Sequence, residues 1–193
     1  MINPKKITDY NRNDWEIQEF FFFACAVAGK DSEQTAQKVE ALSEHINDMF
    51  LENPYYEKNP YETGIIHYLV TCNDGVQVLK NFKFGKYNQW EKFLDWWRQP
   101  VQYLDNFSIS KALRIATIEY LEDIPSVGKK TSRFFKLHTD PEATGIPLDT
   151  HILKFIRSHF NSEKSMLEYL GEVVPKTTPQ SSYTYQFFEN RAK

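Results

Sequence analysis

The chain has 193 residues, a formal net charge of -3 and an isoelectric point near 6.0. This length suits one compact domain with a substantial core. The negative net charge argues against a protein that coats nucleic acid indiscriminately. It does not exclude a local basic patch. No stretch reaches the roughly 18 apolar residues of a membrane span, and the N-terminus lacks the apolar region of a signal peptide. We therefore expect a cytoplasmic protein without a membrane partner.

The first apolar segment, "IQEFFFFACAVAG", carries apolar residues on all sides, which predicts a buried central helix that ends at Gly29. The next segment opens with Asp31 and Gln34 at the spacing of a capping box. Its apolar residues then recur at helical spacing: Ala36, Val39, Leu42, Ile46 and Met49.

A polar connection with two prolines follows at 52–64. The stretch 65–100 suggests two helices, with breaks near 73–75 and 84–85 and an end at Pro100. Residues 108–123 form a further helical segment, and another helix is expected to begin near Asp149. Signals for β-hairpins are weak throughout, so the sequence predicts an all-α fold.

The two cysteines, Cys25 and Cys72, are too few for a disulfide framework, a cysteine-rich zinc site or a four-cysteine iron–sulfur cluster. We expect both to be core residues or free thiols. This cysteine usage agrees with a reducing location and with a protein that carries no iron–sulfur cluster.

The sequence "IPSVGKKT" at 124–131 has the pattern of a helix–turn–helix hairpin. The first helix should end before Pro125, because the residue that precedes a proline is disfavoured in the helical conformation. Gly128 permits a tight, left-handed turn, and a second helix should begin at Lys129. The unpaired N–H groups at the start of that helix would suit one DNA phosphate.

The two adjacent lysines of this segment point in different directions, since successive helical residues are about 100° apart. Lys129, Arg133 and Lys136 form one basic stripe, which predicts a track for phosphates, although such a stripe can also be a solvated face. Lys130 turns towards the apolar side near Phe134, where burial would lower the pKa of its amine and favour a nucleophile. The ordinary alternative is a lysine that keeps its charge in water.

Asp149 precedes an amphipathic helix in "IPLDTHILKFIR". Its ordinary role is that of an N-cap, worth about 1 kcal/mol. A carboxylate at such a position can also face a cleft, where it acts as a base or stabilises positive charge. A nucleophilic lysine and a nearby carboxylate are what the opening of an N-glycosidic bond requires, because the amine attacks C1′ while the carboxylate stabilises the sugar cation.

Together these segments resemble the helix-hairpin-helix signature of the DNA glycosylase superfamily that includes endonuclease III and the 8-oxoguanine glycosylases. That signature runs Leu/Ile-Pro-Gly-Val-Gly-x-Lys-Thr, followed about nineteen residues after the lysine by Val-Asp-Thr-His. The resemblance implies that Lys130 is the Schiff-base lysine and Asp149 the catalytic aspartate. The stretches "FFACAVAGK", "RFFKLHT" and "VPKTTP" are most similar to thermostable-type 8-oxoguanine glycosylases, and the resemblance spans roughly residues 15–190.

The resemblance implies a two-lobed helical fold, with a six-helix lobe at about 30–125 and a second lobe made of 1–29 and 126–193. It also implies a set of residues that contact DNA: Ser126, Gly128, Lys129 and Arg133 at the hairpin, and Lys86 and Tyr87 in "FGKYNQWEKF". The latter segment is similar to the Gly-Leu-Tyr-Asn turn of endonuclease III, which places Lys86 at the position of a leucine wedge and Tyr87 beside it. An exposed turn lysine is the alternative at that position.

Two features depart from the pattern. Ser126 stands where the hairpin signature has its first glycine, and the chain ends soon after "YQFFENRAK", without the longer C-terminal segment expected of that group.

The implied function is base-excision repair of damaged double-stranded DNA. A monomer would remove an oxidised base, 8-oxoguanine first, through a lysine Schiff base with AP-lyase β-elimination. No cofactor is expected beyond a monovalent cation at the hairpin. Two alternatives stay open: a monofunctional glycosylase for an alkylated or mismatched base, and a non-catalytic hairpin module that binds DNA or a partner protein.

Overall fold

The computed structural model describes residues 2–4, 6–52, 64–104 and 107–143. Every regular element in these ranges is an α-helix, and they contain no strand, which confirms the all-α prediction for this part of the chain. Asp149 and the helix predicted to follow it lie outside the described residues. The helices described belong to one compact unit, Met1–Pro141.

In chain order the helices are α1 (Asp14–Ala26), α2 (Ser32–Glu52), α4 (Ile65–Thr71), α5 (Gly75–Asn81), α6 (Tyr87–Tyr103), α7 (Ile109–Ile115), α8 (Ile118–Asp123) and α9 (Lys129–Thr139). No helix among the described residues is both long and apolar enough to cross a membrane.

The predicted breaks near 73–75 and 84–85 are confirmed, but they divide the stretch into three helices, α4, α5 and α6, rather than two. The prediction that the last of these helices stops at Pro100 is wrong. Helix α6 continues to Tyr103, and the N–H of Leu104 still donates to the carbonyl of Pro100 at 3.0 Å. Pro100 has no N–H and so removes one hydrogen bond, yet the helix continues for three residues beyond it.

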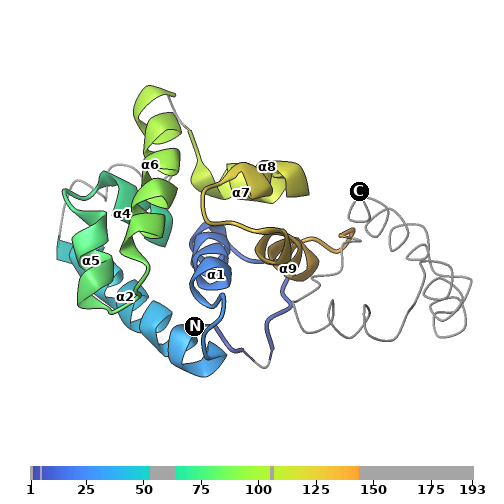
Figure 1. Cartoon of the computed structure of the whole chain (residues 1–193), viewed down its shortest axis with the longest axis horizontal. Helices are drawn as coiled ribbons and strands as arrows, with labels where there is room; N and C mark the ends of the chain where they lie inside the picture. Colours follow the sequence, from blue (N-terminus) through green and yellow to red (C-terminus); the bar gives the residue numbers. More distant parts are fainter. Residues whose placement is uncertain (1, 5, 53–63, 105–106, 144–193) are drawn as a thin grey trace, which may run out of the picture. The chain divides into compact units, whose positions relative to one another are not determined.

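Helix α1 is the centre of this unit, and it packs against α2, α4, α7 and α9 (Figure 1). Its phenylalanines, Phe20 to Phe23, are at most 2% exposed and point in all directions around the helix axis. The Phe21 ring centroid lies 4.9 Å from that of Phe135 on α9 and 6.1 Å from that of Phe93 on α6. The predicted buried central helix is confirmed, and the turn that follows it contains Gly29 at φ 74°.

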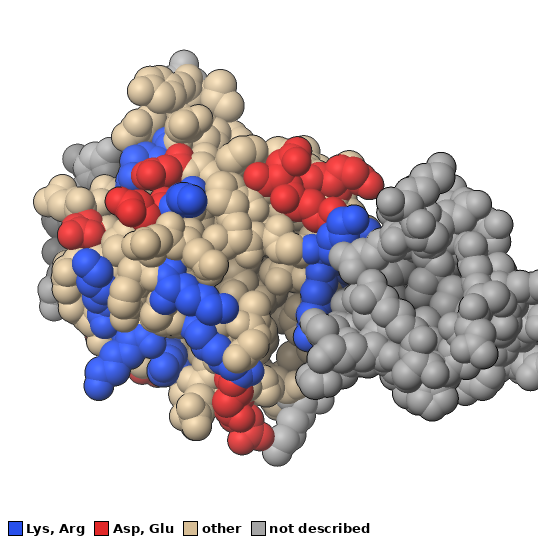
Figure 2. Space-filling view, viewed as in Figure 1, with Lys and Arg blue, Asp and Glu red and all other residues tan. Residues whose placement is uncertain are grey.

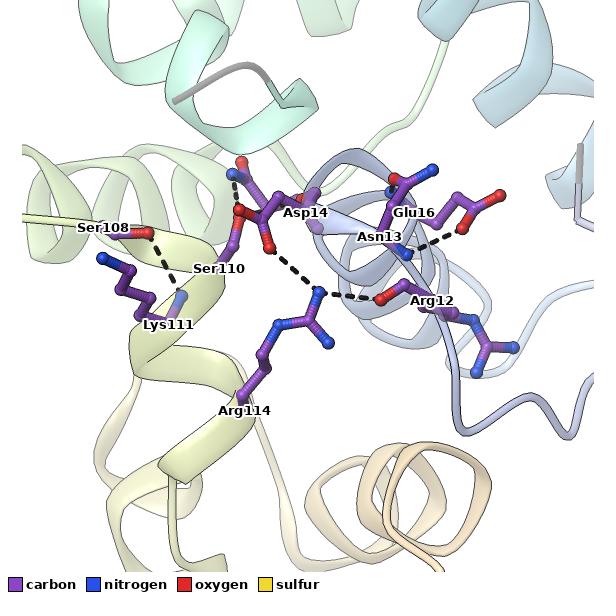
Figure 3. Close-up of polar contacts among 9 residues, drawn as sticks. Arg12, Asn13, Asp14, Glu16, Ser108, Ser110, Lys111 and Arg114 are labelled. Atoms are coloured by element: carbon purple, nitrogen blue, oxygen red, sulfur yellow. Dashed lines mark hydrogen bonds and ion pairs between the residues drawn. The ribbon is translucent and has the colours of Figure 1, made fainter. Parts of the chain in front are cut away.

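The start of α1 is held against α7 by polar contacts (Figure 3). Asn13 and Glu16 form a reciprocal capping box, in which each side chain accepts a hydrogen bond from the other residue's backbone N–H, at 2.9 and 2.8 Å. On α7, the Arg114 guanidinium lies 2.9 Å from the Asp14 carboxylate, and the Ser110 hydroxyl donates to the Asp14 carbonyl at 2.8 Å. These contacts fix the direction of α1, and therefore the position of the residues at its opposite end.

Helix α2 begins where its capping sequence predicts, since the Asp31 carboxylate accepts a hydrogen bond from the Gln34 N–H at 2.8 Å. Four of its five predicted core residues are buried: Ala36, Val39, Leu42 and Ile46. The fifth, Met49, is 41% exposed. The apolar face of α2 therefore contacts the core along most, but not all, of the predicted stripe.

Candidate nucleic-acid interface

Helices α8 and α9 pack against each other and are joined by the turn 124–128, which is the predicted helix–turn–helix hairpin. Ile124 and Val127 are buried and anchor the turn in the core. Gly128 is the N-cap of α9, and as a glycine it has no side chain to cap the first N–H groups of that helix. The hairpin therefore presents backbone donors at the start of α9, as its sequence predicts.

The left-handed residue of this turn is Ser126, at φ 73°, and not Gly128, which is extended at φ -95°. The prediction for Gly128 is wrong because the Val127 N–H donates to the Ile124 carbonyl at 3.0 Å, which closes a type II turn. In such a turn the third residue needs a positive φ, and here that residue is Ser126. The Ser126 hydroxyl also donates to the Gln89 carbonyl at 3.3 Å.

Replacing Ser126 with Gly is expected to stabilise the protein by about 1 kcal/mol. A left-handed residue other than glycine costs about 1–3 kcal/mol, and the greater freedom of glycine in the unfolded chain offsets roughly 0.5–1 kcal/mol of the relief. The gain corresponds to a rise of about 2–4 °C in Tm, measured by calorimetry. The control is Ser32→Gly at the start of α2, which should lower Tm. A lower Tm for Ser126→Gly would mean that the hydrogen bond from Ser126 to Gln89 stabilises the protein more than the left-handed backbone of Ser126 destabilises it.

The basic stripe of α9 is largely paired within the protein. The Arg133 guanidinium forms an ion pair with the Glu122 carboxylate of α8 and is only 15% exposed. Lys136 Nζ lies 3.0 Å from the Asp140 carboxylate, one helical turn further on. The stripe is therefore not the continuous row of outward cations that the sequence suggested, and Lys129 is its one exposed member in the described part of the chain.

Lys130 lines a pocket of about 360 Å³ whose walls include the apolar side chains of Phe23, Val27 and Phe134. The predicted turn towards an apolar surface is thus observed. The expected burial is not, because Lys130 is exposed. Its predicted partner Asp149 lies outside the described residues.

A second pocket, of about 300 Å³, brings together three of the residues predicted to contact DNA. Lys86 comes from the turn before α6, while Ser126 and Gly128 come from the hairpin. Tyr87 lies elsewhere: it lines a different pocket of about 460 Å³, where the Lys80 amine is 5.9 Å from the centroid of its ring. Of the two candidates for a wedge, Lys86 and not Tyr87 lines this pocket with the hairpin residues.

Comparisons with protein-family models, with curated proteins and with solved structures find no match to this chain.

Lys30 is a candidate site residue that the sequence analysis missed, and it lines both pockets. Its amine donates to the carbonyl of Phe84. The pKa of Lys30 lies below its usual value because of partial burial and because Lys86 and Lys38 are nearby cations. No local pattern could reveal this site, since the three lysines come from separate segments of the chain.

The described residues contain no group of histidines, cysteines and acidic residues suited to a metal ion. Cys25 and Cys72 are both free thiols, as predicted. Burial raises the pKa of the Cys25 thiol, so that this side chain stays protonated and behaves as part of the core.

Proposed function

We propose that this chain is a base-excision DNA glycosylase and AP lyase of the helix-hairpin-helix superfamily, which acts on an oxidised base in duplex DNA, 8-oxoguanine first. The observation that carries the proposal is the hairpin and the two pockets beside it. Ser126 and Gly128 line one pocket, and Lys130, in the first turn of the next helix, lines the adjoining apolar one. One hairpin thus offers backbone donors for phosphate and an amine next to a hollow that a flipped nucleotide can enter.

In the proposed reaction the neutral amine of Lys130 attacks C1′ of the damaged nucleotide. The bond from C1′ to the base nitrogen breaks, and the base leaves with the electron pair and takes up a proton. Asp149 accepts the proton that the amine loses and stabilises the positive charge on the sugar. DNA that covers the pocket would exclude water from the exposed Lys130 amine.

The sugar ring then opens, and C1′ and the lysine nitrogen form an imine. Loss of a proton from C2′ breaks the bond between C3′ and its oxygen, which cuts the strand by β-elimination. Hydrolysis of the imine releases Lys130. The proposal includes a monomer with two lobes that works without a cofactor, apart from a monovalent cation at the hairpin.

Borohydride trapping tests the reaction, because borohydride reduces the imine to a stable amine and leaves the protein covalently attached to DNA. The substrates are duplexes that each carry a single lesion: oxidised purines, oxidised pyrimidines, alkylated purines or mismatches. The wild-type protein should be trapped on at least one of them, 8-oxoguanine first. Lys130→Gln should abolish trapping completely.

Lys129→Gln is the matched control, since Lys129 is the adjacent residue and is also exposed. It should still be trapped, because its expected role is to bind phosphate. Excision of a base without any trapped complex would favour the monofunctional alternative. Failure to excise or trap on every lesion would contradict the enzymatic proposal and favour the non-catalytic hairpin module.

A further inference from the structure

Three lysines from separate segments lie together beside the hairpin pocket: Lys30 after α1, Lys38 on α2 and Lys86 before α6. We call them the lysine cluster. Two of the lysines link the turn after α1 to the turn before α6. The Lys30 amine donates to the carbonyl of Phe84, and the Lys86 amine donates to the carbonyl of Ala28 at 3.3 Å. The cluster thus joins the end of α1 to the start of α6 and has a defined geometry.

The cluster places three positive charges near one another. Within the described ranges, none of its three amines forms an ion pair. Four other basic side chains in these ranges do form ion pairs: Arg98, Arg114, Arg133 and Lys136. The mutual repulsion within the cluster is visible in Lys30, whose pKa is lowered by burial and then by Lys86 and Lys38. An anion bound here would relieve that repulsion.

The distribution of charge on the surface agrees with an anion site at the lysine cluster. Figure 2 shows several Lys and Arg side chains over α5, the start of α6 and the adjoining part of α2, with some acidic side chains near them, and a compact acidic patch over α8. The whole chain is net acidic, so this concentration of basic side chains is local. A basic surface of this kind attracts a polyanion and aligns it before close contact is made.

The pocket beside the cluster is also lined by the hairpin. Lys30 and Lys86 line it together with Ser126 and Gly128. Lys86 and Ser126 both have positive φ values, 52° and 73°. Strained backbone of this kind persists where the surrounding structure holds it and concentrates at functional sites. At Ser126 the positive φ belongs to the turn before α9, and at Lys86 it belongs to the N-cap of α6.

We propose that Lys30 and Lys86, supported by Lys38, bind the sugar–phosphate backbone of duplex DNA next to the hairpin. The inference rests on the proposed function and deepens it, because it moves the main phosphate contact from the paired stripe of α9 to the lysine cluster. It also assigns Lys86 to a phosphate instead of to the base stack. Each ammonium group has three donors, so Lys86 keeps two for phosphate oxygens after its bond to Ala28.

The test uses an undamaged duplex and measures no excision. Binding of the full chain to a short labelled duplex is followed by fluorescence anisotropy at several salt concentrations. Lys30→Gln and Lys86→Gln should each reduce the slope of log Kd against log salt by about 1, and the double variant by about 2. Lys30→Arg should keep the slope of the wild type, because it keeps the charge.

Lys111→Gln is the matched control, since Lys111 is an exposed lysine on α7 that lines neither pocket. Its slope should equal that of the wild type. An unchanged slope in the double variant, or an equal loss in Lys111→Gln, would overturn the proposal. Titration with inorganic phosphate provides a second arm: if the double variant loses phosphate binding and keeps full duplex binding, the cluster is a site for free phosphate and the proposal fails.

Failure of this proposal and failure of the proposed function give different results. If Lys130 chemistry is absent, trapping fails on every lesion while the slopes still depend on Lys30 and Lys86. If the cluster does not bind DNA, trapping by Lys130 persists in the double variant and the slopes do not change.

Discussion

Replacing Phe21 with Ala is expected to lower the free energy of unfolding by about 4 kcal/mol, the largest stability effect that we predict for a single side chain. Phe21 is fully buried on α1. Its ring contacts Phe135 of α9 together with Phe93 and Trp97 of α6, at centroid distances of 4.9, 6.1 and 6.5 Å. Three helices meet at this ring, so that its removal leaves a cavity which no single neighbour can fill.

Unfolding in denaturant, followed by circular dichroism, measures the effect. The matched control is Tyr103→Ala, which removes an aromatic ring that is 79% exposed and should change stability by less than about 0.5 kcal/mol. A loss below about 1 kcal/mol for Phe21→Ala would mean that the neighbouring rings collapse into the space. Since Phe135 lies on the second helix of the hairpin, we also expect weaker binding of DNA by the Phe21 variant.

Replacing Asp149 with Asn is expected to reduce base excision by a factor of roughly 10²–10⁴ while DNA affinity stays the same. The proposed reaction needs a negative charge here, first to accept a proton from Lys130 and then to stabilise the sugar cation. Asn is chosen because it caps a helix about as well as Asp does. The substitution therefore removes the charge and keeps the ordinary structural role.

Single-turnover excision and duplex binding are measured on the lesion that gives the trapped complex. Asp48→Asn is the control, since Asp48 is an exposed carboxylate on α2, and it should have full activity. The double variant Lys130→Gln, Asp149→Asn should be no slower than Lys130→Gln alone, because the two groups act in one step. Full excision by Asp149→Asn would contradict the catalytic role of Asp149 and leave helix capping as its only role.

Much of the fold follows from local sequence patterns. The segment of α1, which has apolar residues on all sides, predicts a central helix. The Asp31 cap and the spacing from Ala36 to Ile46 predict α2. Turn residues predict the breaks before α5 and α6 and the hairpin before α9. Helical periodicity also shows that Lys130 diverges from the basic stripe and faces apolar residues. Such features depend on neighbours within a few positions, so they are readable along the chain.

Tertiary structure decides whether Arg133 and Lys30 are site residues, and which residue of the hairpin turn is left-handed. Whether Arg133 is free for phosphate depends on Glu122, which the docking of α8 against α9 brings to it. The left-handed conformation of Ser126 depends on the turn that the hydrogen bond between Ile124 and Val127 closes, and not on Gly128. Lys30 becomes a site residue only because the end of α1 and the turn before α6 meet. The pair of Arg133 with Glu122 and the pocket walls are made by side chains from separate helices and turns, whereas helices and turns are made by residues near in sequence.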